Sequence, residues 1–130
     1  MNVYGSLAGP ETAYFVMETT HRAAQTFTFA ATDAETIAHF RAVLYDPSTP
    51  DRRVAGKIAR GREPYNPDWN FHFIPETVRP NGAGHITCSD NPIFVEDKIE
   101  KVGTDYMRDH FWCPGYMQIV QETHMNGASW

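Results

Sequence analysis

Residues 63–75, with the sequence EPYNPDWNFHFIP, place a rigid turn directly before an aromatic strand. Asn66 precedes a proline and is therefore biased toward extended geometry, while Pro67 presets φ for the first corner of a turn. Asp68 suits the second corner of the same turn. The segment therefore predicts a type I turn over residues 66–69.

The residues that follow this turn alternate with a period of two, as in a strand buried on one face. The aromatic face carries Trp69, Phe71 and Phe73, and the opposite face carries Asn70, His72 and Ile74. This strand is predicted to organise the hydrophobic core.

Further alternating stretches predict five more strands, at residues 12–19, 25–31, 52–60, 85–89 and 116–122. We expect the first two to form a hairpin. We expect the third to pair antiparallel with the strand after Trp69. Together these patterns predict an α+β fold with a mostly antiparallel sheet of five or six strands, packed by two helices.

The first helix is predicted at residues 33–45, because Thr32 and Glu35 have the spacing of a capping box. The second is predicted at residues 92–102, with Asn91 as its N-cap. The length of 130 residues favours one domain over residues 1–130, with a loose arm at 1–11 and a polar tail at 123–130.

A net charge of −5 argues against a general binding surface for nucleic acid or anionic lipid. A basic strip followed by Tyr65 and Trp69 could bind single-stranded nucleic acid, but its alternation is also that of a solvated strand face. The strip consists of Arg52, Arg53, Lys57, Arg60 and Arg62. No apolar run is long enough for a membrane span. Together with the net charge, this means that neither a membrane nor nucleic acid is expected as a partner.

Cys88 and Cys113 are the two cysteines of the chain. On the residues alone they either pair or remain buried thiols. If they pair, the closed loop of about 26 residues would stabilise the fold by ~3–4 kcal/mol and imply an oxidising compartment.

Several segments, taken in order, resemble the domain of the slime-mould cAMP-inducible prespore protein family and its small bacterial relatives, some labelled calmodulin-like. They are TFTFAATD at 26–33, GKI at 56–58, PYNPDWNFHFIP at 64–75, CSD at 88–90, the acidic helix at 94–102 and WCP at 112–114. The resemblance implies the fold class, secretion and a Cys88–Cys113 disulfide. It implies no catalytic residue, because the family has no settled activity, and the chain has no EF-hand loop.

A metal site is only weakly indicated. The six histidines lack the close spacing of transition-metal ligands. Asp46 and Asp51 share one loop with Ser48 and Thr49, which leaves calcium as an alternative ligand. No other cofactor is expected.

An enzyme is a further alternative, as a small hydrolase in which His72 works beside Asp68 or Glu76. The sequence has no G-x-S-x-G nucleophile elbow, and the bland interpretation is that His72 is a solvated strand residue.

The loop at residues 61–68 is rich in proline and aromatic residues, and a rigid loop loses little entropy on docking. We therefore expect a non-enzymatic, secreted protein that binds an extracellular protein or glycan. The candidate binding residues are Arg62, Tyr65, Asn66, Asp68, Trp69, Asn70 and His72. One alternative is a protease inhibitor that presents Arg60 or Arg62. Another is that Tyr65 and Trp69 only pack against the hydrophobic core and bind no partner.

Overall fold

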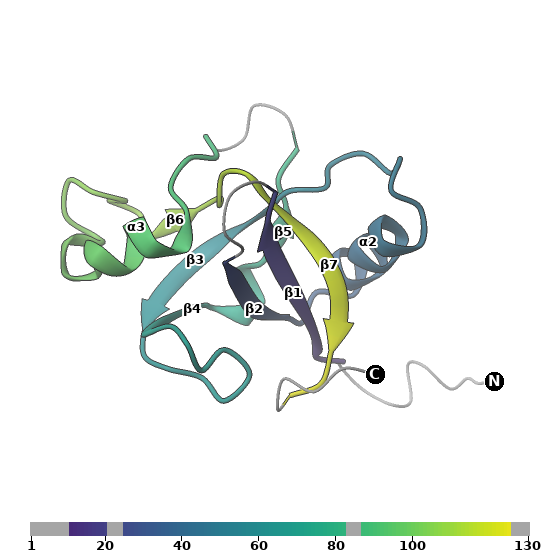
Figure 1. Cartoon of the computed structure of the whole chain (residues 1–130), viewed down its shortest axis with the longest axis horizontal. Helices are drawn as coiled ribbons and strands as arrows, with labels where there is room; N and C mark the ends of the chain where they lie inside the picture. Colours follow the sequence, from purple (N-terminus) through teal and green to yellow (C-terminus); the bar gives the residue numbers. More distant parts are fainter. Residues whose placement is uncertain (1–10, 21–24, 83–86, 126–130) are drawn as a thin grey trace.

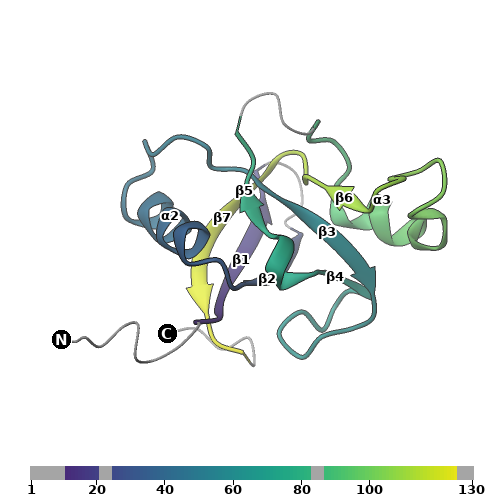
Figure 2. The ribbon, with the colours of Figure 1, turned by 180° about the vertical axis from the view of Figure 1, so that it is seen from behind.

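The computed structural model describes residues 11–20, 25–82 and 87–125. The chain forms two antiparallel sheets that face each other, with one longer helix at the side (Figure 1). Seen from behind, the order of the two layers is reversed (Figure 2). The predicted α+β class is therefore confirmed.

The first sheet has the order β2-β1-β7 and consists of β1 (Ala13–Thr19), β2 (Thr26–Ala31) and β7 (Met117–Thr123). β1 pairs antiparallel with β2, from Ala13 opposite Ala31 to Glu18 opposite Thr26, which confirms the predicted hairpin. β7 pairs with the other side of β1 and shifts register between Val16 and Met17. β2 is therefore an edge strand.

The second sheet is built on β3 (Val54–Arg60), which pairs antiparallel with β4 (Phe71–Phe73), β5 (Arg79–Pro80) and β6 (Phe111–Trp112). The predicted pairing of β3 with the strand after the turn is confirmed, although that strand begins at Phe71. The prediction of a single sheet of five or six strands is wrong. Alternation defines the faces of a strand but not its partner, and here the strands divide between two sheets.

The helices are α2 (Ala34–Tyr45) and α3 (Pro92–Asp97), and the 3₁₀ turns are η1 (Pro75–Thr77) and η2 (Ile99–Lys101). The N-cap of α2 is Asp33, whose carboxylate accepts a hydrogen bond from the Thr36 N–H at 3.0 Å. The predicted cap on Thr32 is therefore one residue too early.

Asn91 caps α3 as predicted, because its Oδ1 accepts from the Phe94 N–H at 3.1 Å. The helix expected to reach residue 102 ends at Asp97, and the chain continues through η2.

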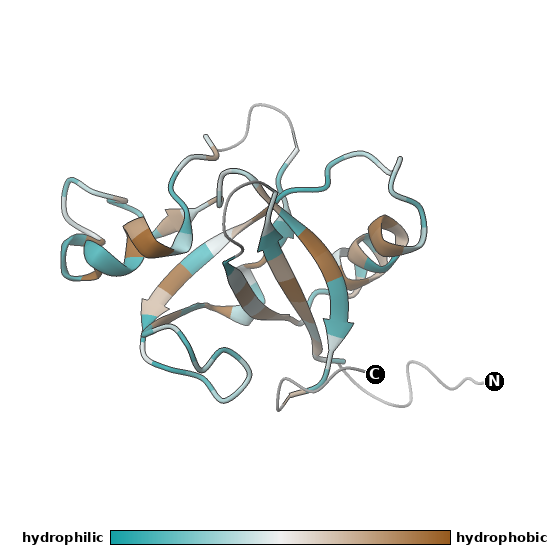
Figure 3. Cartoon of the chain, in the orientation of Figure 1, coloured by the Kyte–Doolittle hydropathy of each residue, from teal (hydrophilic) through white to brown (hydrophobic). Residues whose placement is uncertain are grey.

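The two sheets meet in an aromatic core. The ring centroids of Phe27 and Phe73 are 5.8 Å apart, and those of Phe29 and Phe73 are 5.9 Å apart. Phe40 of α2 reaches Phe15 of β1 at 5.7 Å and closes the core at the side. All five rings are buried. Hydrophobic and hydrophilic residues alternate along the strands in Figure 3. Burial of these rings is the main favourable term for this fold.

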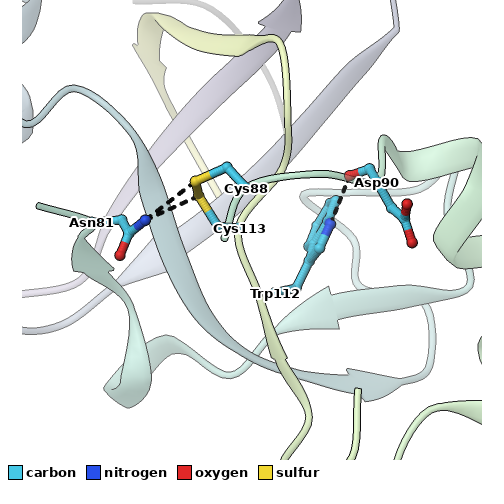
Figure 4. Close-up of a disulfide and its surroundings, with 5 residues drawn as sticks. All are labelled: Asn81, Cys88, Asp90, Trp112 and Cys113. Carbon is cyan, nitrogen blue, oxygen red and sulfur yellow. Dashed lines mark hydrogen bonds between the residues drawn. A yellow bond between two sulfur atoms is a disulfide. The ribbon is translucent and has the colours of Figure 1, made fainter. Parts of the chain in front are cut away.

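Cys88 and Cys113 form a disulfide, as the family resemblance implied. The Asn81 side-chain amide donates to both sulfurs, at 3.2 Å and 3.5 Å (Figure 4). Next to the bridge, the Trp112 indole N–H donates to the Asp90 carbonyl oxygen at 2.9 Å. The bridge therefore fastens the segment before α3 to the end of β6.

The strand predicted at 85–89 is not formed where it is described: residues 87 and 88 are irregular, and Ser89 makes an isolated bridge with Pro114. Residues 85 and 86, most of the predicted arm at 1–11 and residues 126–130 of the predicted tail lie outside the described residues. The tail was predicted to begin at residue 123, but Thr123 is the last residue of β7. No helix in the described ranges is long and apolar enough to cross a membrane.

Candidate functional site

The segment between β3 and β4, residues 61–70, contains most of the predicted binding residues, and we call it the β3–β4 loop. Two successive turns shape it: the Asn66 N–H donates to the Glu63 carbonyl oxygen at 2.9 Å, and the Trp69 N–H to the Asn66 carbonyl oxygen at 3.4 Å. The second of these is the turn predicted at residues 66–69. These two hydrogen bonds fix the backbone of the loop at its turns.

Asn66 holds this loop to both sheets. The residue is only 2% exposed. Its Oδ1 accepts from the Thr28 N–H at 2.9 Å, and its Nδ2 donates to the Phe71 carbonyl oxygen at 3.1 Å. Thr28 belongs to β2 of the first sheet and Phe71 to β4 of the second. Asn66 was predicted to bind a partner, but the structure places both polar ends of its amide on the backbone.

Trp69 makes a second link to the same edge strand. Its indole N–H donates to the Thr26 carbonyl oxygen at 2.7 Å, and its ring centroid lies 6.3 Å from that of Phe27. Trp69 packs against the hydrophobic core and is half-buried. The Asn66 amide and the Trp69 indole thus both bond to the outer edge of β2, which would otherwise offer free backbone groups to another chain.

Tyr65 is buried, with 7% of its surface exposed, and its ring lies 5.2 Å from that of Tyr14 between centroids. Burial, followed by the charge of Glu63, raises the pKa of the Tyr65 phenol. The neutral phenol therefore persists to more alkaline pH than that of an exposed tyrosine. Tyr65 and Trp69 thus have the positions expected of side chains that pack the interior of the protein.

The remaining predicted residues of the loop are exposed. Arg62, Asp68 and Asn70 are accessible, and the Arg62 guanidinium donates to Asn70 Oδ1 at 2.9 Å. The Asn70 N–H donates to the Glu96 carboxylate of α3 at 2.6 Å. The loop is thus tied to α3 as well as to both sheets, and its polar groups stand on a supported backbone.

His72 lies on β4 beside the loop. Its Nδ1 is 2.9 Å from the Gly61 carbonyl oxygen, and because a carbonyl only accepts, Nδ1 carries the hydrogen. Its Nε2 is 3.6 Å from a carboxylate oxygen of Glu63, beyond a normal hydrogen bond. The carboxylate that the structure places beside His72 is thus that of Glu63, whereas the sequence had suggested Asp68 or Glu76 as its partner.

The two aspartates considered for calcium lie after α2. The Asp46 carboxylate accepts from the Ser48 N–H at 3.0 Å and from its hydroxyl at 2.8 Å, and these bonds lower the pKa of Asp46. Asp51 adopts a left-handed backbone with φ of 56°. Within the described ranges, no group of three or more His, Cys, Asp or Glu residues could hold a metal ion.

Arg60, which the inhibitor alternative uses, is the last residue of β3, and its guanidinium donates to the Glu100 carbonyl oxygen at 3.3 Å. Sequence reasoning missed Glu63 and Glu96, which contact His72 and the loop. No local pattern could have identified them, because each reaches its partner only after the chain has folded.

A family model described as the BP-74 N-terminal domain matches residues 11–126. The match spans all of the described residues, and it is consistent with the prespore-type domain that the sequence motifs resemble. It says nothing of bacterial or calmodulin-like relatives. No curated protein and no solved structure matches the chain.

Proposed function

The chain belongs to the family of BP-74 N-terminal domains, and we propose that it is a non-enzymatic, secreted protein that binds an extracellular protein through the β3–β4 loop. The observation that carries this proposal is the attachment of the loop to three elements. Asn66 bonds to β2 and β4, Trp69 bonds to β2, and Asn70 bonds to α3.

A loop that is already ordered loses less conformational entropy on binding than a flexible one. Its exposed groups, Arg62 and Asp68, carry opposite charges and flank two exposed prolines, Pro64 and Pro67. Such a surface is suited to a partner with complementary charges, and an Arg can contribute strongly to binding at an interface. The Cys88–Cys113 disulfide supports an oxidising location.

A protein partner is better supported than a glycan. A sugar would stack on an exposed aromatic ring, but Tyr65 is buried and Trp69 is half-buried and packs against the hydrophobic core. Both polar ends of the Asn66 amide are also hydrogen-bonded to backbone groups, those of Thr28 and Phe71. Of its proposed contacts, the glycan alternative therefore keeps Asp68, Asn70 and the exposed part of Trp69.

Binding to panels of purified extracellular proteins and glycans, with and without a calcium chelator, tests the proposal. The Arg62→Ala/Asp68→Ala double variant is expected to bind protein partners at least about tenfold more weakly than the wild type, since it removes both exposed charges of the loop. The matched control is Arg53→Ala/Glu35→Ala, which removes two exposed charges outside the loop.

The proposal fails if every partner binds the loop variant as well as the wild type. If only glycans bind, the partner of the loop is a sugar and not a protein. Loss of binding in chelator alone would point to calcium.

A protease inhibitor is a second candidate, because Arg62 is exposed on a loop that the fold holds in place. Stoichiometric protein is then expected to inhibit a trypsin-like protease. Arg62→Ala should abolish the inhibition, whereas Arg53→Ala should leave it unchanged. Cleavage of a small substrate at the normal rate in the presence of the protein rules the inhibitor out.

A further inference from the structure

A cavity of about 360 Å³ lies beside β3, between that strand and the stretch around η2. Four segments line it: β3, the residue after β4, the stretch around η2 and the residue before β6. The lining residues are Lys57, Ile58, Ala59, Arg60, Ile74, Ile99, Val102 and His110. This volume is at the lower end of the range of small-molecule pockets, which is roughly 300–1,000 Å³.

The walls of the cavity are mainly aliphatic. Ile58 is only 1% exposed, so it forms part of the inner wall, whereas Ile99 and Val102 are half-buried and pack against the edge of the hydrophobic core. Together with Ile74 and Ala59 they offer a surface that an apolar group would remove from water.

In the wall nearest β6, the His110 ring lies close to the backbone of Gly103. Gly103 has φ of 93°, and a Cβ at this position would lie only 2.6 Å from His110 Nε2. His110 also has a positive φ, 67°, and its carbonyl oxygen accepts from the Ile58 N–H at 3.0 Å. The His110 imidazole can therefore lie beside residue 103 only because glycine has no side chain.

The charged residues that line the cavity are cationic. Lys57 and Arg60 are both exposed, so their charges stand on the solvent side, and no Asp or Glu is among the described lining residues. Arg60 carries five N–H donors, and within the described residues its guanidinium gives one hydrogen bond, to the Glu100 carbonyl oxygen.

The Lys57 ammonium lies 5.6 Å from the centre of the Phe111 ring. The nearest acidic residue along the chain from His110 is Asp109, whose carboxylate accepts from the Phe111 N–H at 3.3 Å. Among the described residues, no salt bridge involves Lys57 or Arg60, so a ligand can pair with these cations without first breaking an ion pair.

We propose that this cavity binds a small organic anion with an apolar body, such as a medium-chain carboxylate. The carboxylate pairs with Arg60 at the mouth, where Lys57, three positions away on β3, adds a second positive charge. The hydrocarbon part lies among Ile58, Ile74, Ile99 and Val102. Pairing with a guanidinium is a charge-assisted hydrogen bond, and the apolar walls supply the remaining affinity. This site is separate from the exposed charges of the β3–β4 loop, so it can be present or absent whatever the partner of that loop.

The test is an NMR titration of the full-length protein, labelled at its Ile and Val methyl groups, with octanoate as the probe. Octan-1-ol serves as a neutral probe of the same length, and acetate as an anion without the apolar body. Octanoate is expected to bind saturably and to shift the methyl signals of Ile58, Ile74, Ile99 and Val102. Octan-1-ol should bind more weakly, and acetate should leave these signals unchanged.

Arg60→Gln is expected to weaken octanoate binding by about ten- to a hundredfold and to leave octan-1-ol binding unchanged, because it removes only the charge partner. Arg60→Lys should restore part of the loss. Lys57→Gln provides a second charge variant should Arg60→Gln disturb η2, and a denaturation curve for each variant verifies the fold. The matched control is Arg53→Gln, an exposed arginine outside the cavity.

The proposal is overturned if octanoate produces no saturable shift at these methyl groups. It is also overturned if octan-1-ol binds as tightly as octanoate, or if Arg60→Gln and Lys57→Gln both behave like Arg53→Gln.

Discussion

At the scale of single residues, Asn66 shows how one side chain can hold a loop in place. Its amide satisfies a donor of β2 and an acceptor of β4, each at a normal hydrogen-bond distance. A buried amide that bonds at both ends is stabilising, whereas its removal leaves two backbone groups without a protein partner. Asn66 therefore contributes to the fold in addition to any role of the loop in binding.

Asn66→Ala is expected to lower the free energy of unfolding by about 2–4 kcal/mol, because the Thr28 N–H and the Phe71 carbonyl each lose their partner. Urea denaturation measures the change. The control is Asn70→Ala, whose exposed side chain accepts a hydrogen bond from Arg62 and which should shift stability by no more than about 0.5 kcal/mol. Equal midpoints for the two variants would show that the Asn66 amide does not hold the loop.

At the scale of elements, the caps decide where the helices begin. Asp33 accepts from the Thr36 hydroxyl at 2.8 Å and from its N–H at 3.0 Å. These bonds, aided by Arg79, lower the pKa of Asp33 below the ordinary value near 3.9. Thr32 was the residue expected to cap this helix, and the two positions allow a direct comparison.

Asp33→Ala should cost about 1 kcal/mol of stability at neutral pH, because α2 loses its N-cap. Thr32→Ala should change stability by less than about 0.5 kcal/mol. Since the pKa of Asp33 is lowered in the folded state, its contribution is complete above the ordinary pKa and is lost as the pH falls through the folded one. Denaturation curves at neutral and acidic pH should therefore show the difference between wild type and Asp33→Ala narrowing in acid. A difference that does not depend on pH would contradict this role of the carboxylate.

The β3–β4 loop is also an element-scale feature. Through Asn66 and Trp69 it covers part of the outer edge of β2, and an uncovered edge strand can pair with another chain. The same segment that presents Arg62 and Asp68 to solvent thus protects the first sheet. This double role explains why Asn66 is buried and Trp69 is half-buried, although both were predicted to bind a partner.

At the scale of the whole molecule, two small sheets share one aromatic core, and the disulfide joins the segment before α3 to the end of β6. A cross-link of this kind stabilises mainly by restricting the unfolded chain. The Asn81 amide adds hydrogen bonds to both sulfurs.

Reduction of the disulfide is expected to lower the free energy of unfolding by ~3–4 kcal/mol, given the 25-residue separation of the two cysteines. Guanidinium denaturation with and without reductant measures the change. The Cys88→Ser/Cys113→Ser variant controls for other effects of the reductant, to which it should be insensitive. Alkylation of the unfolded protein at two thiols in the absence of reductant would show that the bridge is not present.

The amino-acid sequence by itself determined the features that depend on neighbours a few positions apart. These are the turn at residues 66–69, the alternation of the strands, the Asn91 cap and, within one residue, the start of α2. The α+β class follows from the same local signals. The disulfide was implied by the family resemblance and not by these patterns.

Only the tertiary structure decided which strands pair, which side chains of the β3–β4 loop are buried, and where a cavity forms. Asn66 meets Thr28 across 38 positions of sequence, and the cavity takes its walls from four separate segments. Local patterns give the faces of strands and the ends of helices, because these depend on backbone geometry over a few residues. Contacts between distant segments depend on how the two sheets assemble around the shared core, and no short stretch of sequence encodes that arrangement.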